Sequence, residues 1–187
     1  MTFPGVNFDP STMYFPDPLG VKELNLGDAW RAVWIDSAEL PADVPVPFAY
    51  GVVVCDGKGY VTRPAGEGRW AVVEGDLPAG ENPLASVKRA ALAQAGAMGG
   101  RADLVGYFDC KATSYNTEFP LGARAVRPIY LFIAKSMKDI GKASGFERRR
   151  LPLNEFARAL RDSYPELGET IMLAVDRYSI MHARGEA

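Results

Sequence analysis

Two strand-forming runs near the middle of the chain constrain its fold most, because they predict two paired strands in a fixed register. The runs 50–55 and 60–63 are rich in β-branched and aromatic residues. The sequence Asp56-Gly57-Lys58-Gly59 between them favours a tight turn. We therefore predict a β-hairpin here, against which the other elements pack.

A helix is expected after this hairpin. A short strand at 70–73 precedes a loop at 74–82, which is rich in Gly and Pro. From 83 to 95 the apolar residues recur at helical spacing, with Pro83 suited to the first turn and Gly96 to the end. The predicted apolar face consists of Leu84, Val87, Ala91, Leu92 and Ala95.

The rest of the chain extends this α+β order. Strands are expected at 30–35, 104–110 and 126–134. The stretch 135–150 is basic and contains Gly and Ser, which predicts a mobile connection. Two helices are expected after it, the first capped by Asn154 with Phe156 and Leu160 inward, the second opened by Pro165 with an apolar side formed by Leu167, Ile171, Ala174 and Tyr178.

The N-terminal part differs in character from the later sequence. Residues 1–29 alternate aromatic side chains with Pro, Gly and Asp, which blocks helix formation and favours an extended arm. We therefore divide the chain into an arm with one strand, residues 1–47, and a folded domain, residues 48–187. The aromatic residues of the arm are candidates for contact with a second subunit in a homodimer: Phe3, Phe8, Tyr14 and Phe15.

Composition excludes several classes of protein. The chain has 187 residues, 48% of them hydrophobic and 24% charged, which suits one globular domain. Its net charge of −2 lacks the cationic excess that bulk nucleic-acid binding requires. No apolar run approaches the length of a membrane-spanning helix, so no membrane partner is expected.

The cysteines and the N-terminal sequence indicate the compartment. Cys55 and Cys110 lie far from any Cys-x-x-Cys spacing, which predicts buried free thiols rather than a zinc site or a disulfide. The first residues lack the basic and apolar regions of a signal peptide. We expect a cytoplasmic protein.

Residues 70–97 resemble the Nudix box. In that family the box reads Gly, five residues, Glu, seven residues, Arg-Glu, an apolar residue, any residue, Glu-Glu, any residue and Gly. Gly75, Glu81, Arg89 and Gly96 occur at the matching positions, Gly80 completes a Gly-Glu pair, and Trp70 and Arg63 match flanking positions. The resemblance covers about residues 48–180 and implies a mixed β-sheet flanked by helices, an α/β/α sandwich.

The three glutamates that the family places after the arginine are missing. Their positions hold Ala90, Ala93 and Gln94, whose spacing predicts one helical face. In the family these carboxylates hold Mg²⁺ or Mn²⁺, which neutralises a diphosphate and helps to activate water. Two methyl groups and one amide lack the anionic oxygens that such a cation needs.

Two readings remain open for each remaining box residue. Glu81 is either a metal ligand or general base, or a structural carboxylate paired with a basic residue near the start of the helix. Arg89 either holds the loop against the helix, as the resemblance implies, or is a solvated charge. Gly75 and Gly80 either bring backbone amides close to a diphosphate or adopt left-handed turn angles.

The flanking residues also have two readings. Trp70 either stacks on a base while Arg63 meets a phosphate, or belongs to the core. The run Arg148-Arg149-Arg150 either binds an anionic ligand or the acidic surface of a partner, or is a solvated charged segment.

These residues support two main hypotheses for function. The first is a Nudix-like protein without metal-dependent hydrolysis, which binds a nucleotide-like or phosphorylated ligand or a protein partner and needs no cofactor. The second is an active hydrolase of a nucleoside diphosphate linked to another group, with Glu81 as its catalytic residue. Under this alternative Mg²⁺ or Mn²⁺ is held by Glu81 and by carboxylates outside the helix, for which the candidates are Glu74, Asp76, Asp109 and Glu118.

Overall fold

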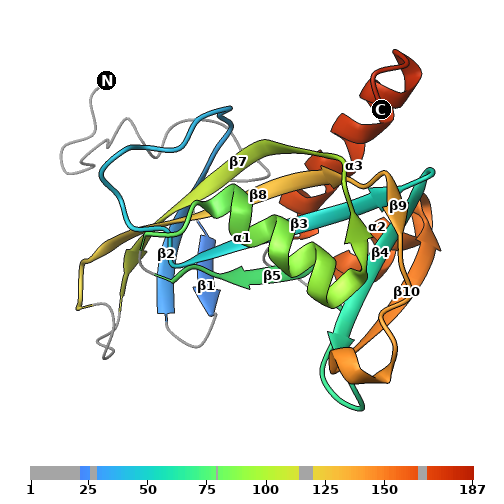
Figure 1. Ribbon diagram of the computed structural model, residues 1–187. Helices are drawn as coiled ribbons and strands as arrows, with labels where there is room; N and C mark the ends of the chain where they lie inside the picture. The colour runs from blue at the N-terminus through green and yellow to red at the C-terminus, as the bar shows by residue number, and fades with distance from the viewer. Residues whose placement is uncertain (1–21, 26–28, 79, 114–119, 164–167) are drawn as a thin grey trace.

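The computed structural model describes residues 22–25, 29–78, 80–113, 120–163 and 168–187. One large sheet dominates this part of the chain (Figure 1). Along the sheet the strands lie in the order β1 (Lys22–Asn25), β2 (Ala29–Ile35), β7 (Arg101–Ala112), β8 (Arg124–Ile133), β3 (Phe48–Cys55), β4 (Lys58–Pro64) and β10 (Phe146–Pro152). A further strand, β5 (Val73–Asp76), pairs with β3.

The sheet is mixed rather than purely antiparallel. β3 and β8 run parallel, with Tyr50 opposite Ile129, whereas the neighbouring pairs β7–β8 and β3–β4 are antiparallel. The hairpin predicted over 50–63 is confirmed as β3 and β4, joined at Asp56 and Gly57. Gly57 has a φ of 68°, a conformation that glycine adopts at little cost.

Helices cover both faces of the sheet (Figure 1). α1 (Pro83–Ala90), which continues as the π-helical turn η2 (Ala91–Ala95), lies on one face, and α2 (Leu153–Ser163) and α3 (Gly168–Ala183) lie on the other. A small ladder of β6 (Ala97–Met98) with β9 (Ser136–Met137) and the 3₁₀ turn η3 (Lys142–Ser144) complete the described elements. Within these residues no helix combines the length and the apolar character needed to cross a bilayer.

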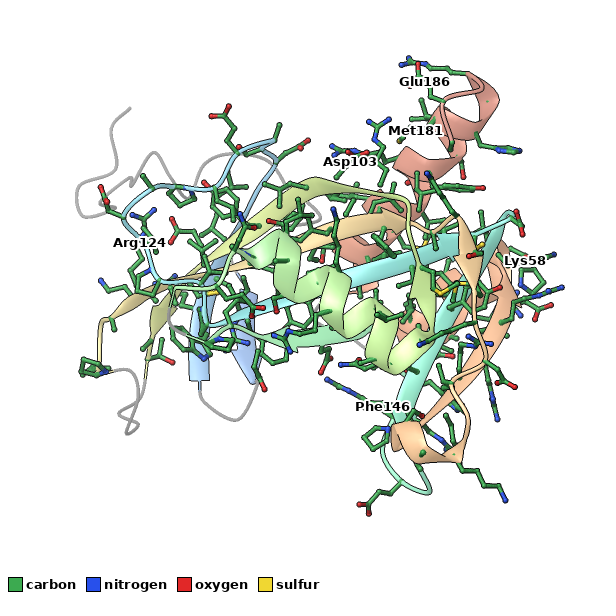
Figure 2. All side chains as sticks on the ribbon, in the orientation of Figure 1. Lys58, Asp103, Arg124, Phe146, Met181 and Glu186 are labelled. Carbon is green, nitrogen blue, oxygen red and sulfur yellow. The ribbon has the colours of Figure 1, made fainter. Side chains whose placement is uncertain are left out.

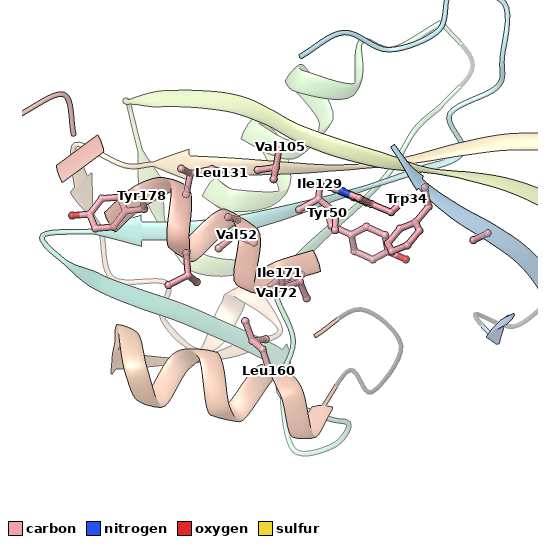
Figure 3. Packing of buried hydrophobic residues seen from close by; sticks show 14 of the residues in the cluster. Trp34, Tyr50, Val52, Val72, Val105, Ile129, Leu131, Leu160, Ile171 and Tyr178 are labelled. Atoms are coloured by element: carbon pink, nitrogen blue, oxygen red, sulfur yellow. The ribbon is translucent and has the colours of Figure 1, made fainter. Parts of the chain in front are cut away.

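Alternating strand residues divide the core between the two faces. Tyr130 packs with Ala49 and with Val87 of α1, whereas its neighbour Leu131 faces α2 and α3. Figure 3 shows the larger cluster, in which Leu160 of α2 and Ile171 of α3 pack over the sheet. The predicted inward residues Phe156, Leu160, Ile171, Ala174 and Tyr178 are all buried, as the sequence predicts.

The two cysteines are buried free thiols, as predicted. Burial raises the pKa of Cys110 to about 12, so this side chain carries almost no thiolate at neutral pH. Burial also raises the pKa of Cys55. Both residues therefore act as small apolar side chains of the core.

The local predictions around the helix need two corrections. The strand predicted at 70–73 is instead β5, and Glu74, Gly75 and Asp76 lie on it rather than in a loop. Pairing with β3 determines where β5 ends, because the paired residues extend to Asp76, which lies opposite Phe48. Leu92, predicted to face inward, is 41% exposed, because the helix changes to π geometry at Ala91 and the apolar face shifts.

The prediction for segment 135–150 is the least accurate. This segment contains β9, η3 and the start of β10, and Arg148, Arg149 and Arg150 lie on β10 rather than on a mobile connection. The pairing of β10 with β4 orders these residues, and no local sequence pattern reveals it. Asn154 lies inside α2, which begins at Leu153, so it does not cap this helix.

The described residues of the N-terminal part form two strands rather than one. β2 confirms the strand predicted at 30–35, and β1 pairs with it, although its sequence Lys-Glu-Leu-Asn carries no strand signal. Both belong to the same sheet as the strands after residue 47. The arm aromatics, Pro165 and Leu167 lie outside the described residues.

Candidate functional site

The residues that match the Nudix box lie where β5 meets α1. Gly75 is buried on β5, and a Cβ placed on it would lie 2.5 Å from Ser86 Oγ of α1. The Ser86 hydroxyl donates to the Asp76 carbonyl at 3.1 Å. Gly75 has no positive φ, so it does not adopt a left-handed turn angle; its hydrogen side chain lets the helix pack against the strand.

Glu81 and Arg89 form an ion pair across the start of α1. Arg89 donates from Nη2 to Glu81 Oε2 at 2.7 Å and from Nε to Oε1 at 3.2 Å. The same guanidinium donates to the Asp76 carbonyl at 3.2 Å, so it joins the loop, the strand and the helix. The hydrogen bond and charge of Glu81 raise the pKa of Arg89.

The three positions of the missing glutamates do not share one environment. Ala90 is 4% exposed within an apolar cluster, Ala93 is exposed, and Gln94 is half-buried. Exposure thus differs along this short stretch. The helix ends there in a π turn, in which the Gly96 N–H bonds to the Ala91 carbonyl, five residues back, and also to the Leu92 carbonyl.

Gln94 uses its side-chain amide on the backbone of β5. Its Nε2 donates to the Glu74 carbonyl at 2.6 Å, and its Oε1 accepts from the Glu74 N–H at 3.2 Å. The N–H and C=O groups of Glu74 point away from β3, so the side-chain amide of Gln94 binds the free edge of β5 as a further strand would. The oxygen of Gln94 is thus already occupied by a backbone donor.

Replacing Gln94 by Glu should lower the free energy of unfolding by about 1–2 kcal/mol, because a carboxylate cannot donate to the Glu74 carbonyl and would leave it facing a negative charge. Urea denaturation measures the difference. Ala93→Glu adds the same charge at the exposed neighbouring position and should change stability by less than about 0.5 kcal/mol. Equal losses in the two variants would contradict this role of Gln94.

The donor set of this helix does not fit a divalent cation. The family's metal needs several anionic oxygens, whereas Ala90 and Ala93 supply none and the Gln94 amide is bound to backbone. Glu81 is committed to Arg89, and Asp109 to Arg124 at 2.6 Å. Among the residues that the structure describes, no group of three or more His, Cys, Asp or Glu is placed to hold a metal, and Glu118 lies outside them.

The other end of the helix is closed by Gly96 and Arg148. Gly96 ends the helix with a φ of 72°, and a Cβ there would lie 2.3 Å from the Lys138 carbonyl. Arg148 Nη1 donates to the Ala95 carbonyl and, at 2.8 Å, to the Lys138 carbonyl. A guanidinium at a helix C-terminus also interacts favourably with the helix dipole.

A basic hollow of about 750 Å³ lies beside the end of β4. Four cationic side chains line it, but only two acidic ones, Asp139 and Glu147. Figure 2 shows one of its residues, Phe146, at the end of the molecule where β4 finishes. The lining consists of Arg63, Ala65, Trp70, Asp139, Ile140, Gly141, Lys142, Phe146, Glu147, Arg148 and Arg149.

The structure brings the predicted ligand residues Arg63 and Trp70 together in this hollow. The Arg63 guanidinium lies 4.5 Å from the centre of the Trp70 ring, and that of Arg149 lies 4.3 Å from it. Arg63 also pairs with Glu147 at 2.6 Å, and its hydrogen bond lowers the pKa of Glu147. The Trp70 ring thus holds two guanidiniums.

Gly75 and Gly80 do not line the hollow. Gly75 is buried under α1, and Gly80 is exposed in the loop before it with a φ of 84°, as one of its two readings predicted. Arg149, Lys142 and Phe146 were not predicted to line one hollow with Trp70. The basic run is visible in the sequence, but only the pairing of β10 with β4 places Arg149 beside Val61 and near Trp70.

Solved structures of Nudix hydrolases share this fold. The pyrophosphohydrolase BsRppH of Bacillus subtilis matches with a TM-score of 0.54 at 14% identity, over 76% of this chain and 90% of that one. A NUDIX hydrolase from Nitrosomonas europaea matches with a TM-score of 0.50 at 18% identity, over 73% and 89%. No protein-family model matches the sequence, and no curated protein matches it. The chain therefore has the Nudix fold, which confirms the predicted α+β architecture.

Proposed function

We propose that this Nudix-fold chain binds a phosphorylated compound in the basic hollow, without a metal and without hydrolysing it. The observation that carries the proposal is the pair of guanidiniums held over Trp70. Arg63 and Arg149 come from different strands, β4 and β10, and both reach the same ring. Two guanidiniums so arranged suit a phosphate or diphosphate, which accepts several charge-assisted hydrogen bonds.

Trp70 acts in this proposal as a positioning residue rather than as a platform for a base. An arginine side chain loses considerable rotamer entropy when it is held in one place. Stacking on an aromatic ring restrains the guanidinium before the ligand arrives and leaves its N–H groups available at the edge of the guanidinium plane. The same ring is thereby covered, so stacking of a ligand base on Trp70 is not part of the proposal.

The charge of the hollow supports binding of an anion. Arg63 is balanced by Glu147, whereas Arg149 and Lys142 form no ion pair with any residue in the described ranges. Asp139 is the other acid of the lining. An anion entering the hollow thus meets guanidinium and ammonium groups whose charge is not already neutralised by a contact.

The helix formed by α1 and η2 explains why we propose binding without hydrolysis. Pyrophosphate hydrolysis in the family relies on carboxylate-bound cations, and Ala90, Ala93 and Gln94 do not supply such ligands. Fixed arginines stabilise a bound diphosphate, but they do not generate a hydroxide nucleophile at neutral pH. The geometry favours a binding site over a hydrolytic one.

Titration calorimetry with inorganic pyrophosphate in EDTA tests this function. We expect binding by the native chain and at least about tenfold weaker binding by Arg149→Met, since a charge-assisted hydrogen bond contributes about 1.5–3 kcal/mol. Arg150→Met is the matched control, because Arg150 lies on the same strand opposite Tyr60 and does not line the hollow. It should change the affinity by less than about twofold.

Two results would contradict the proposal. One is an equal loss in both variants, which would indicate only a diffuse charge effect. The other is divalent-dependent phosphate release that Glu81→Gln abolishes, which would favour the hydrolase hypothesis instead.

A further inference from the structure

The segment 138–145, which we call the wall segment, forms one side of the basic hollow. It connects β9 to β10 and contains η3. None of its residues is buried; Ile140 and Ser144 are half-buried and the others are exposed. Asp139 and Ile140 line both the basic hollow and a second hollow of about 320 Å³ over Ala93. The wall segment therefore separates two spaces while contributing little to the core.

Two glycines give this segment conformational freedom. Gly141 has a φ of 59° and Gly145 a φ of 73°, and a Cβ at either position would meet no atom within 4 Å. Both residues thus adopt backbone angles that favour glycine. Neither position is crowded by neighbouring atoms. Since glycine reaches both positive and negative φ at similar cost, the backbone can rotate at both points without a steric barrier from neighbours.

Few hydrogen bonds attach the segment to the rest of the fold. At its start the Lys138 N–H donates to the Gly96 carbonyl at 2.8 Å, and Arg148 donates to the Lys138 carbonyl. At its end the Ala65 N–H donates to the Gly145 carbonyl at 2.9 Å. There the Ser144 hydroxyl also donates to the Phe146 carbonyl at 3.2 Å and accepts from the Phe146 N–H at 3.1 Å. Segments with few buried contacts and few hydrogen bonds open at low free energy.

Arg148 connects this segment to the end of the Nudix-box helix. Its Nη1 bonds both to the Lys138 carbonyl and to the Ala95 carbonyl, and its guanidinium lies 5.4 Å from the centre of the Tyr60 ring. One side chain thus joins three elements: the helix, the wall segment and, through Tyr60, β4. Loss of this side chain would free the start of the wall segment from the helix.

We propose that the wall segment is a hinged side of the basic hollow, which Arg148 holds in its closed position and a bound phosphate stabilises there through Lys142. This inference rests on the proposed function. Lys142 is the cation that the wall segment brings to the hollow. A phosphate contacts it only when the segment is closed, so the ligand has a differential interaction with the two positions, as a population shift requires.

Hydrogen exchange measured by mass spectrometry on the full chain tests the hinge. Without ligand, Arg148→Met should speed exchange of the hydrogen-bonded amides of Lys138, Ser144 and Gly145 by about tenfold or more, whereas Arg150→Met should leave it unchanged. Inorganic pyrophosphate should slow the same amides in the native chain. In Lys142→Met, an exposed substitution that leaves the core intact, pyrophosphate should no longer slow them.

The outcomes separate the hinge from the proposed function. If calorimetry shows pyrophosphate binding but exchange of the Lys138, Ser144 and Gly145 amides does not change, the hinge is wrong and the binding site stands. The role of Arg148 is also overturned if Arg148→Met leaves exchange in the wall segment unchanged while the variant remains folded. Native exchange rates in β3 and β8 would show that it remains folded. If the native chain does not bind pyrophosphate, the proposed function fails and ligand-driven closure fails with it.

Discussion

Ala90→Glu should lower the free energy of unfolding by about 3–5 kcal/mol, although it restores a residue that the Nudix box contains. The Ala90 side chain is 4% exposed and lies in an apolar cluster with Val53, Val73 and Phe132. A carboxylate there would lose its hydration without gaining a cationic partner within that cluster. Urea denaturation of the native and variant chains measures the loss.

The pH dependence of Ala90→Glu gives a second readout. Burial would raise the pKa of the new carboxyl above its value in the unfolded chain, so the folded variant would bind a proton more readily. The deficit relative to the native chain should therefore shrink as pH falls and grow as pH rises through the raised pKa. Ala93→Glu, at an exposed position, is the control and should show neither effect. Stability close to native in Ala90→Glu at neutral pH would show that this position is not closed to a carboxylate.

Gly75→Ala should lower the free energy of unfolding by about 2–3 kcal/mol, because α1 lies too close to β5 for a methyl group. The added Cβ would lie 2.5 Å from Ser86 Oγ, but 3.3 Å from the nearest backbone atom of Ser86. The hydroxyl is thus the main obstacle. Thermal or urea denaturation measures the effect.

A second substitution tests that cause directly. Ser86→Ala removes the obstructing oxygen and its hydrogen bond to the Asp76 carbonyl, which still accepts from Arg89. Alone it should cost at most about 1 kcal/mol. In the double variant the two losses should not add, and a favourable coupling of about 1 kcal/mol or more is expected. Simple additivity would contradict a steric role for Ser86.

Local patterns in the sequence predicted the elements that depend on local structure. The hairpin of β3 and β4 is predicted by a turn and two β-branched runs, and α1 by apolar periodicity ended by Gly96. β5 and β10 were misplaced because pairing with distant strands decides them. Arg63 and Glu147, which face one another across β4 and β10, are 84 residues apart in the chain.

The candidate site was predicted in part for the same reason. The spacing from Gly75 to Gly96 revealed the Nudix-like arrangement and the missing carboxylates. It did not reveal that the helix continues as a π turn from Ala91, because a change from i, i+4 to i, i+5 bonding leaves no clear mark in a run of alanines. Nor did it place Arg149 over Trp70, which requires β10 beside β4.

The strand order also governs how this protein folds as the ribosome makes it. β3 and β4 leave the ribosome early, but β8 and β10, which pair with their outer edges, are made much later. At about 5–20 residues per second, the 84 residues between Arg63 and Glu147 take roughly 4–17 s to add. For much of that interval the valine-rich strand β3 has an unpaired edge, which is prone to association with other chains. The yield of folded protein therefore depends on the arrival of the late strands rather than on the speed of the first hairpin.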